Sequence, residues 1–120
     1  MRDNFLGGSE YKLMEIIWDN APIPSGELAI LCEKIHGWKR TTVYTMVKRL
    51  SDKELIKSEK SNITYIKSRS EIQKQQSEDL VKRNFMGSLP MFVSAFLGDK
   101  SLSKEDATKL IDMIEQHTED

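Results

Sequence analysis

The chain of 120 residues contains one cysteine, Cys32, and this scarcity excludes two classes of protein. A single cysteine cannot build an internal disulfide framework or a multi-cysteine metal site. There is also no apolar run of membrane-spanning length and no signal-peptide pattern. We therefore expect a cytoplasmic protein that does not insert into a membrane.

Patterns typical of catalysis and metal binding are missing as well. The two histidines, His36 and His117, are far apart in the sequence and have no partners at metal-ligand spacing. No nucleophile elbow, phosphate-binding loop or paired-carboxylate pattern stands out. Cys32 falls on an apolar helix face, where a free cysteine usually serves as a small core residue. We expect no enzyme, no metal site and no cofactor.

An excess of charge of one sign is lacking, since the net charge is −1, but the charges are unevenly distributed along the chain. Residues 38–69 contain nine basic and three acidic residues, whereas residues 71–120 contain six basic and ten acidic residues. A basic segment favours a polyanionic partner. The acidic C-terminal part should stay away from such a partner and serve another purpose.

The first 70 residues predict three helices followed by a hairpin. Ser9 is placed to cap a first helix that runs to about Asn20, and the two prolines of "NAPIPSG" mark a turn. Ser25 is a good N-cap for a second helix, which Gly37 ends. A third helix spans about residues 40–53, and two β-rich pieces flank the polar turn Lys60-Ser61-Asn62.

The third helix has a clear apolar face, because Val43, Met46, Val47 and Leu50 recur at i, i+3, i+4 and i+7. Its other side is polar and basic. In a helix-turn-helix the second helix enters the major groove, where Arg, Lys and Thr contact base edges or phosphates. The hairpin would lie beside the duplex as a wing. The predicted DNA contacts are therefore Lys39, Arg40, Thr41, Thr42, Tyr44, Thr45, Lys48 and Arg49 on the helix, with Lys60 and Asn62 on the wing.

Two other interpretations of the basic helix remain open. It can be an ordinary solvated face, with Tyr44 as a half-buried packing residue. The winged helix can also serve only for contact with another protein. A steep salt dependence of binding to duplex DNA separates DNA binding from both.

The last 50 residues predict three further helices that cannot enclose a core by themselves. Ser70-Glu71-Ile72-Gln73 has the form of a capping box for a long polar helix to about Met86. A short apolar helix, "LPMFVSAFL", follows, and Ser103 caps the last helix. The uncovered apolar residues either pack back on the first domain or meet a second copy of the chain. We expect the second copy, with an interface of Phe85, Leu89, Phe92, Val93, Phe96, Leu97, Leu110, Ile111 and Ile114.

The fold class expected from these patterns is mainly α with a small β-hairpin. Residues 1–70 form a winged helix-turn-helix for DNA, and residues 71–120 form a helical dimerisation domain.

The stretch from "MEIIWDN" to "SDKELI", followed by "ITYIKS", resembles the penicillinase-repressor family of bacterial winged-helix proteins. The matching features include the Glu-x-x-x-Trp of the first helix, Trp38, Thr42-Val43 with Thr45, and Arg49-Leu50. "LSKEDATKLIDMIEQ" is similar to the last helix of the family. The resemblance implies a homodimeric repressor on a palindromic operator that controls β-lactam resistance genes.

The resemblance also implies how repression ends. In the family a membrane sensor protease responds to a β-lactam, and the repressor is cut between Asn and Phe in the apolar helix before the final loop. The matching bond in this chain joins Ala95 to Phe96, and Asn84-Phe85 is an alternative site. A repressor that answers a different signal remains the other interpretation.

The chain departs from the family in three places. Many relatives begin the third helix with Ser-Pro, where this chain has Lys39-Arg40. Many have Gly after the lysine that ends this helix, where Glu54 stands here. The copper-responsive relatives carry a C-terminal cysteine cluster that this chain lacks, which favours the β-lactamase repressors as its closer kin.

Overall fold

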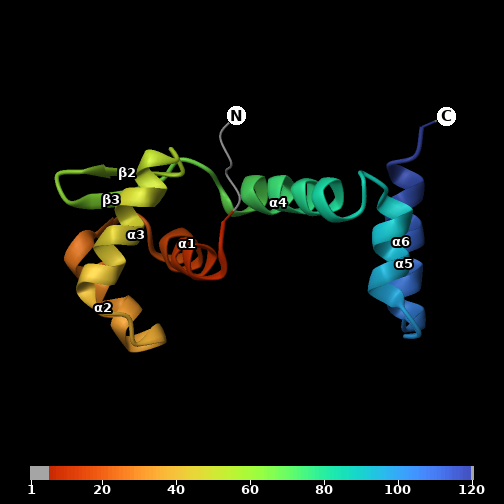
Figure 1. Ribbon diagram of the computed structural model, residues 1–120, viewed down its shortest axis with the longest axis horizontal. Coiled ribbons are helices and arrows are strands. Elements are labelled where there is room, and N and C mark those ends of the chain that lie inside the picture. The colour runs from red at the N-terminus through yellow and green to blue at the C-terminus, as the bar shows by residue number, and fades with distance from the viewer. Residues whose placement is uncertain (1–5, 120) are drawn as a thin grey trace. The chain divides into compact units, whose positions relative to one another are not determined.

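The computed structural model describes residues 6–119, which are mainly helical with one small antiparallel sheet, as the sequence predicts. The chain divides into two compact units between Asp79 and Leu80. The first unit contains α1 (Gly8–Asn20), α2 (Ser25–His36), α3 (Arg40–Asp52) and all the strands (Figure 1). The strands are β1 (Ile23–Pro24), β2 (Ile56–Glu59) and β3 (Asn62–Tyr65).

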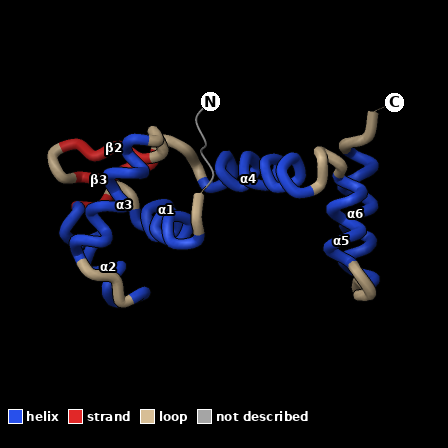
Figure 2. The backbone as a smooth tube through the Cα atoms, in the orientation of Figure 1, coloured by secondary structure: helices blue, strands red, loops and turns tan. Residues whose placement is uncertain are grey.

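The sheet has the order β1-β3-β2, and both pairs are antiparallel. Figure 2 shows β2 and β3 as the two sides of the hairpin. Lys60 and Ser61 form the tip of the wing, with φ of 52° and 62°. Two successive positive φ values are typical of a type I′ turn, which suits the twist of a two-stranded hairpin. Asn62, predicted as part of the turn, is already paired with Glu59 in the sheet.

The strand β1 differs from the sequence prediction, since the prolines around it predict only a turn. Ile23 pairs with Ile63 and Pro24 with Asn62. This position suits Pro24, because an edge strand tolerates a residue without a backbone N–H. The short pairing joins the α1–α2 connection to the wing.

The core of the first unit gathers one face from each helix and one from the sheet. Leu13, Ile17, Leu28, Val43 and Ile63 are fully buried in it. Cys32 also belongs to this cluster, and its burial raises the pKa of its thiol to about 11. The predicted role of Cys32 as a small core residue is therefore confirmed.

Helix ends differ from the sequence prediction at three serines. The first helix begins at Gly8, and the Glu10 carboxylate accepts from the Gly7 N–H at 3.3 Å, so Ser9 is not the cap. Ser25 is the first residue of α2 and not its cap. The capping box of α4 (Arg69–Asn84) is built by Ser68 and Glu71, not by Ser70 and Gln73. Two hydrogen bonds from Ser68 lower the pKa of the Glu71 carboxyl.

The C-terminal ends of α2 and α3 agree with the sequence prediction. Gly37 ends α2 with φ of 70°, a left-handed conformation that glycine adopts without strain. Glu54 follows α3 with φ of 62°. This is a left-handed conformation, which residues other than glycine adopt uncommonly.

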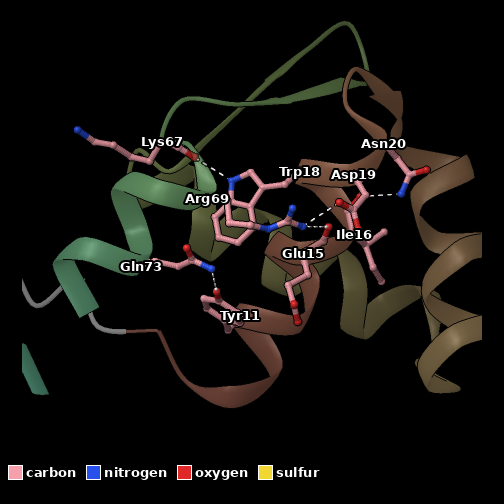
Figure 3. A network of polar contacts seen from close by, with 9 residues as sticks. All are labelled: Tyr11, Glu15, Ile16, Trp18, Asp19, Asn20, Lys67, Arg69 and Gln73. Carbon is pink, nitrogen blue, oxygen red and sulfur yellow. Dashed lines mark hydrogen bonds and ion pairs between the residues drawn. The ribbon is translucent and has the colours of Figure 1, made fainter. Parts of the chain in front are cut away.

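A network of polar contacts attaches the start of α4 to α1 (Figure 3). The indole N–H of Trp18 donates to the Lys67 carbonyl at 2.9 Å. The Arg69 guanidinium donates to the Asp19 carboxylate at 2.8 Å and lies over the Trp18 ring. The hydrogen bond to Asp19 raises the pKa of Arg69. This network gives a role to Trp18, the last apolar residue of α1, whose indole N–H and ring both contact the segment at the start of α4.

The second unit contains the end of α4, α5 (Leu89–Leu97) and α6 (Lys104–Gln116). Ser88 caps α5 and Ser103 caps α6, the latter as predicted. Phe85 packs edge-on against Phe92, with ring centroids 5.4 Å apart. No residue of α5 or α6 is buried in the described chain.

We predict that Trp18→Phe lowers the free energy of unfolding by roughly 0.5–1.5 kcal/mol, since it removes the hydrogen bond to the Lys67 carbonyl. Urea unfolding followed by circular dichroism measures the change. The matched control is Lys12→Ala, an exposed change on the same helix, which should stay within about 0.5 kcal/mol of the wild type. Equal stability of Trp18→Phe and wild type would contradict this role of the indole.

Candidate nucleic-acid interface

The burial of α3 determines which of its side chains face solvent. Val43, Met46 and Leu50 are at most 5% exposed, and the helix packs on α1, α2 and β2. Val47, predicted as part of the buried face, is half-buried and packs against the core. The opposite side of α3 is therefore free for a ligand.

Every residue predicted to contact DNA is exposed. Tyr44, considered above as a half-buried packing residue, is 39% exposed. The exposed set on or beside α3 is Lys39, Arg40, Thr41, Thr42, Tyr44, Thr45, Lys48 and Arg49, and Lys60 and Asn62 are exposed on the wing. These residues come from two adjoining structures, the polar side of α3 and the tip of the β2–β3 hairpin.

The polar side of α3 contains a shallow hollow of about 230 Å³, which is lined by Thr41, Thr42, Thr45, Met46 and Arg49. The Thr45 hydroxyl donates to the Thr41 carbonyl at 3.0 Å. Its proton is thereby used within the helix, so Thr45 offers a partner its methyl group and its oxygen lone pairs. Arg49 adds five N–H donors beside it. The hollow thus presents donor, acceptor and apolar groups together.

The connection between α2 and α3 is short and stiffened by aromatic rings. Only residues 37–39 separate the two helices. The Trp38 ring stacks on His36 with centroids 4.4 Å apart and packs against the core. Lys39 is the N-cap of α3 but makes no side-chain cap hydrogen bond. The helix therefore begins with two exposed cations, Lys39 and Arg40, in place of a capping side chain.

One lysine of the basic segment, Lys53, is half-buried and paired with a carboxylate instead. The Lys53 ammonium donates to both Glu10 carboxylate oxygens at 3.2 Å, and the two side chains are 24% and 14% exposed. This pair joins the end of α3 to the start of α1 across 43 positions of sequence. Sequence patterns group Lys53 with the other cations and give no sign of this partner.

The wing carries a mixed set of charges. Lys57 pairs with Glu59 at 3.4 Å on the exposed β2 strand. Lys60 stands at the tip, next to Ser61 and Asn62. The wing cation best placed for a polyanion is therefore Lys60.

The residues expected at a dimer interface fall into two groups. Leu89, Val93, Phe96, Leu110, Ile111 and Ile114 are between 42% and 61% exposed. Phe85, Phe92 and Leu97 are half-buried within the second unit. Ala95, beside the expected cleavage bond, is exposed.

Other kinds of site find little support in residues 6–119. No helix of this part of the chain is long and apolar enough to cross a membrane. No cluster of three or more His, Cys, Asp or Glu residues within the same range could hold a metal ion.

Comparison with known proteins agrees with this arrangement. The model of the family described as penicillinase repressor matches residues 6–116. A penicillinase repressor of Bacillus licheniformis is 25% identical over 116 residues, which cover 93% of this chain and 91% of the relative. A penicillinase repressor of Staphylococcus aureus is 24% identical over 110 residues, which cover 88% and 87% of the two chains. Because the family match extends over nearly the whole chain, this protein belongs to the penicillinase repressor family of transcriptional repressors.

Proposed function

We propose that this protein is a homodimeric repressor whose two winged helices bind the half-sites of a palindromic operator. The observation that carries the proposal is the polar side of α3, where a hollow containing Arg49 and three threonines faces solvent. In the proposed complex α3 lies in the major groove and the wing tip approaches the phosphate backbone.

The side chains suit a division between reading and positioning. Arg49 can donate two hydrogen bonds to O6 and N7 of a guanine, and Thr45 can meet a thymine methyl or a base amino group. Positive charge for phosphate contacts comes from Lys39, Arg40, Lys48 and Lys60. The Tyr44 hydroxyl and the Asn62 amide can donate hydrogen bonds to phosphate oxygens. Thr41 and Thr42 at the first turn of α3 complete the contact surface.

A second copy of the chain is the proposed cover for the apolar surface of the second unit. Each of α5 and α6 exposes large aliphatic or aromatic side chains along its length. Such contiguous apolar surface is rare on a monomer. Pairing through these helices also joins two DNA-binding units, so that the second half-site binds at high effective concentration.

The proposed targets are genes for β-lactam resistance, which the names of the relatives support. The proposed release is a cut in the second unit by a membrane sensor protease, because separation of the two winged helices removes most of the operator affinity. The bond between Ala95 and Phe96 lies in the last turn of α5, where helix ends fray. The alternative bond follows Asn84, the last residue of α4.

The first test of this proposal concerns base reading. Arg49→Ala should weaken binding to the selected operator by roughly 1–3 kcal/mol, because a bidentate base contact is lost. Fluorescence anisotropy with labelled duplexes measures this. The matched control is Lys109→Ala, which removes one exposed charge from α6 and should leave the affinity unchanged. Lys60→Ala should weaken binding to all sequences alike and reduce the salt slope by about 1. An unchanged affinity of Arg49→Ala would refute the groove assignment.

The second test concerns the dimer. Ile111 is 55% exposed, so Ile111→Glu should leave each chain folded. In a dimer it would bury a carboxylate without a partner, and we expect the dissociation constant of the dimer to rise about 100-fold. Analytical ultracentrifugation measures the change against Thr108→Glu, which adds the same charge at an exposed polar position of α6. A wild-type protein that sediments as a monomer at micromolar concentration would contradict the proposed homodimer.

The third test concerns release. Mass spectrometry of the repressor from β-lactam-treated cells should show a fragment that ends at Ala95. A fragment that ends at Asn84 would move the cut to the alternative bond. Phe96→Ala should slow the first cut, while Phe85→Ala serves as its control. An intact chain during full induction would exclude release by proteolysis.

A further inference from the structure

A second hollow of the first unit lies between the end of α1, the strand β1 and the helix α2. Its volume is about 320 Å³, at the lower end of the range for small-molecule sites. The residues that line it are Asn20, Pro22, Ile23, Glu27, Ile30 and Leu31. None of these six belongs to the surface proposed for DNA, so the hollow is free for a different ligand.

Most of the lining of this hollow is apolar. Ile23 is buried, Leu31 is half-buried, and Ile30 is 49% exposed. Ile30 lies on the solvent side of α2, which turns Leu28 and Cys32 into the core. A ligand with an apolar body that covers Ile30 and Leu31 would remove apolar surface from water, which favours binding.

The charge of the hollow is negative and unbalanced. Glu27 lies in the first turn of α2 and is exposed. Its carboxylate has no hydrogen bond or ion pair within residues 6–119. The described lining of the hollow contains no lysine or arginine. The hollow therefore favours a cation over an anion.

The end of α1 adds acceptors of the same sign. The side-chain N–H of Asn20 donates to the Ile16 carbonyl at 2.8 Å, which leaves the side-chain oxygen as an acceptor (Figure 3). Asn20 is the last residue of α1, where the helix dipole has its negative pole. The described last turn of this helix contains no basic residue, and Arg69, which contacts it, is paired with Asp19.

The hollow also adjoins the strand that joins the α1–α2 connection to the wing. Ile23 pairs with Ile63 of β3. Two residues later, the Ser25 N–H donates to the carbonyl of Ser61 at the wing tip, at 2.8 Å. A ligand in the hollow would thus contact the strand that pairs with the wing.

We infer that this hollow binds a small organic cation, an amine whose ammonium group meets Glu27 and Asn20 while its apolar body covers Ile30 and Leu31. An ammonium group offers only N–H donors, and a carboxylate offers only acceptors, so the two are complementary. A neutral alcohol of the same shape would gain only the apolar part of this binding. The inference does not rest on the proposed binding of DNA.

The test is a titration of the isotopically labelled full-length protein, followed by NMR at the methyl groups of Ile23, Ile30 and Leu31. The probes are benzylamine, a cation at neutral pH, and benzyl alcohol, which keeps the ring and lacks the charge. The variant is Glu27→Gln. Its matched control is Glu33→Gln, the same change at an exposed position of α2 that does not line the hollow.

For the wild type and the control, we expect saturable shifts at the lining residues and an affinity for benzylamine about tenfold higher than for benzyl alcohol. Glu27→Gln should lower the affinity for benzylamine about tenfold and leave that for benzyl alcohol unchanged, since only the charged contact is lost. Equal binding of the two probes to the wild type would overturn the inference. So would shifts that do not saturate, or a Glu27→Gln protein that binds benzylamine as the control does.

Discussion

The burial of one face of α3 is the constraint on which the rest of the interface depends. Val43, Met46 and Leu50 must leave water, and they do so against α1, α2 and β2. Once these three positions are fixed, the helical period turns Thr41, Thr45 and Arg49 outward. The hollow on α3 thus results from core packing, and the ion pair between Lys53 and Glu10 joins the end of this helix to the start of α1.

The two units of the chain satisfy the hydrophobic effect in different ways. The first buries side chains from all its helices and from the sheet, together with the start of α4. The second gives α5 and α6 apolar faces that stay exposed within one chain. The core of the first unit is therefore complete within one chain, while the second unit would gain stability from the proposed pairing with a second copy. The proposed cut in α5 would act on the unit that this pairing would stabilise.

Local periodicity in the sequence predicts the helices and their exposed sides, but it misses contacts between residues far apart in the chain. The spacing of Val43, Met46 and Leu50 is sufficient to place α3 and its exposed side. Nearby serines compete as caps, and the choice of Ser68 over Ser70 depends on where α4 meets α1. The two residues of β1 pair with β3 about 40 positions later, and no local pattern contains that information. The partners of Lys53 and Arg69 cannot be predicted for the same reason, since α1 supplies both.

Methylation protection by dimethyl sulfate tests the central claim most directly, because the reagent attacks guanine N7 in the major groove and adenine N3 in the minor groove. If α3 enters the major groove in each half of a dimer, bound repressor should protect guanine N7 in two patches, on the same face of the duplex and about one or two helical turns apart. Arg49→Ala should remove protection of one guanine in each patch and leave the others. Protein bound at full occupancy without any protected guanine N7 would contradict the account.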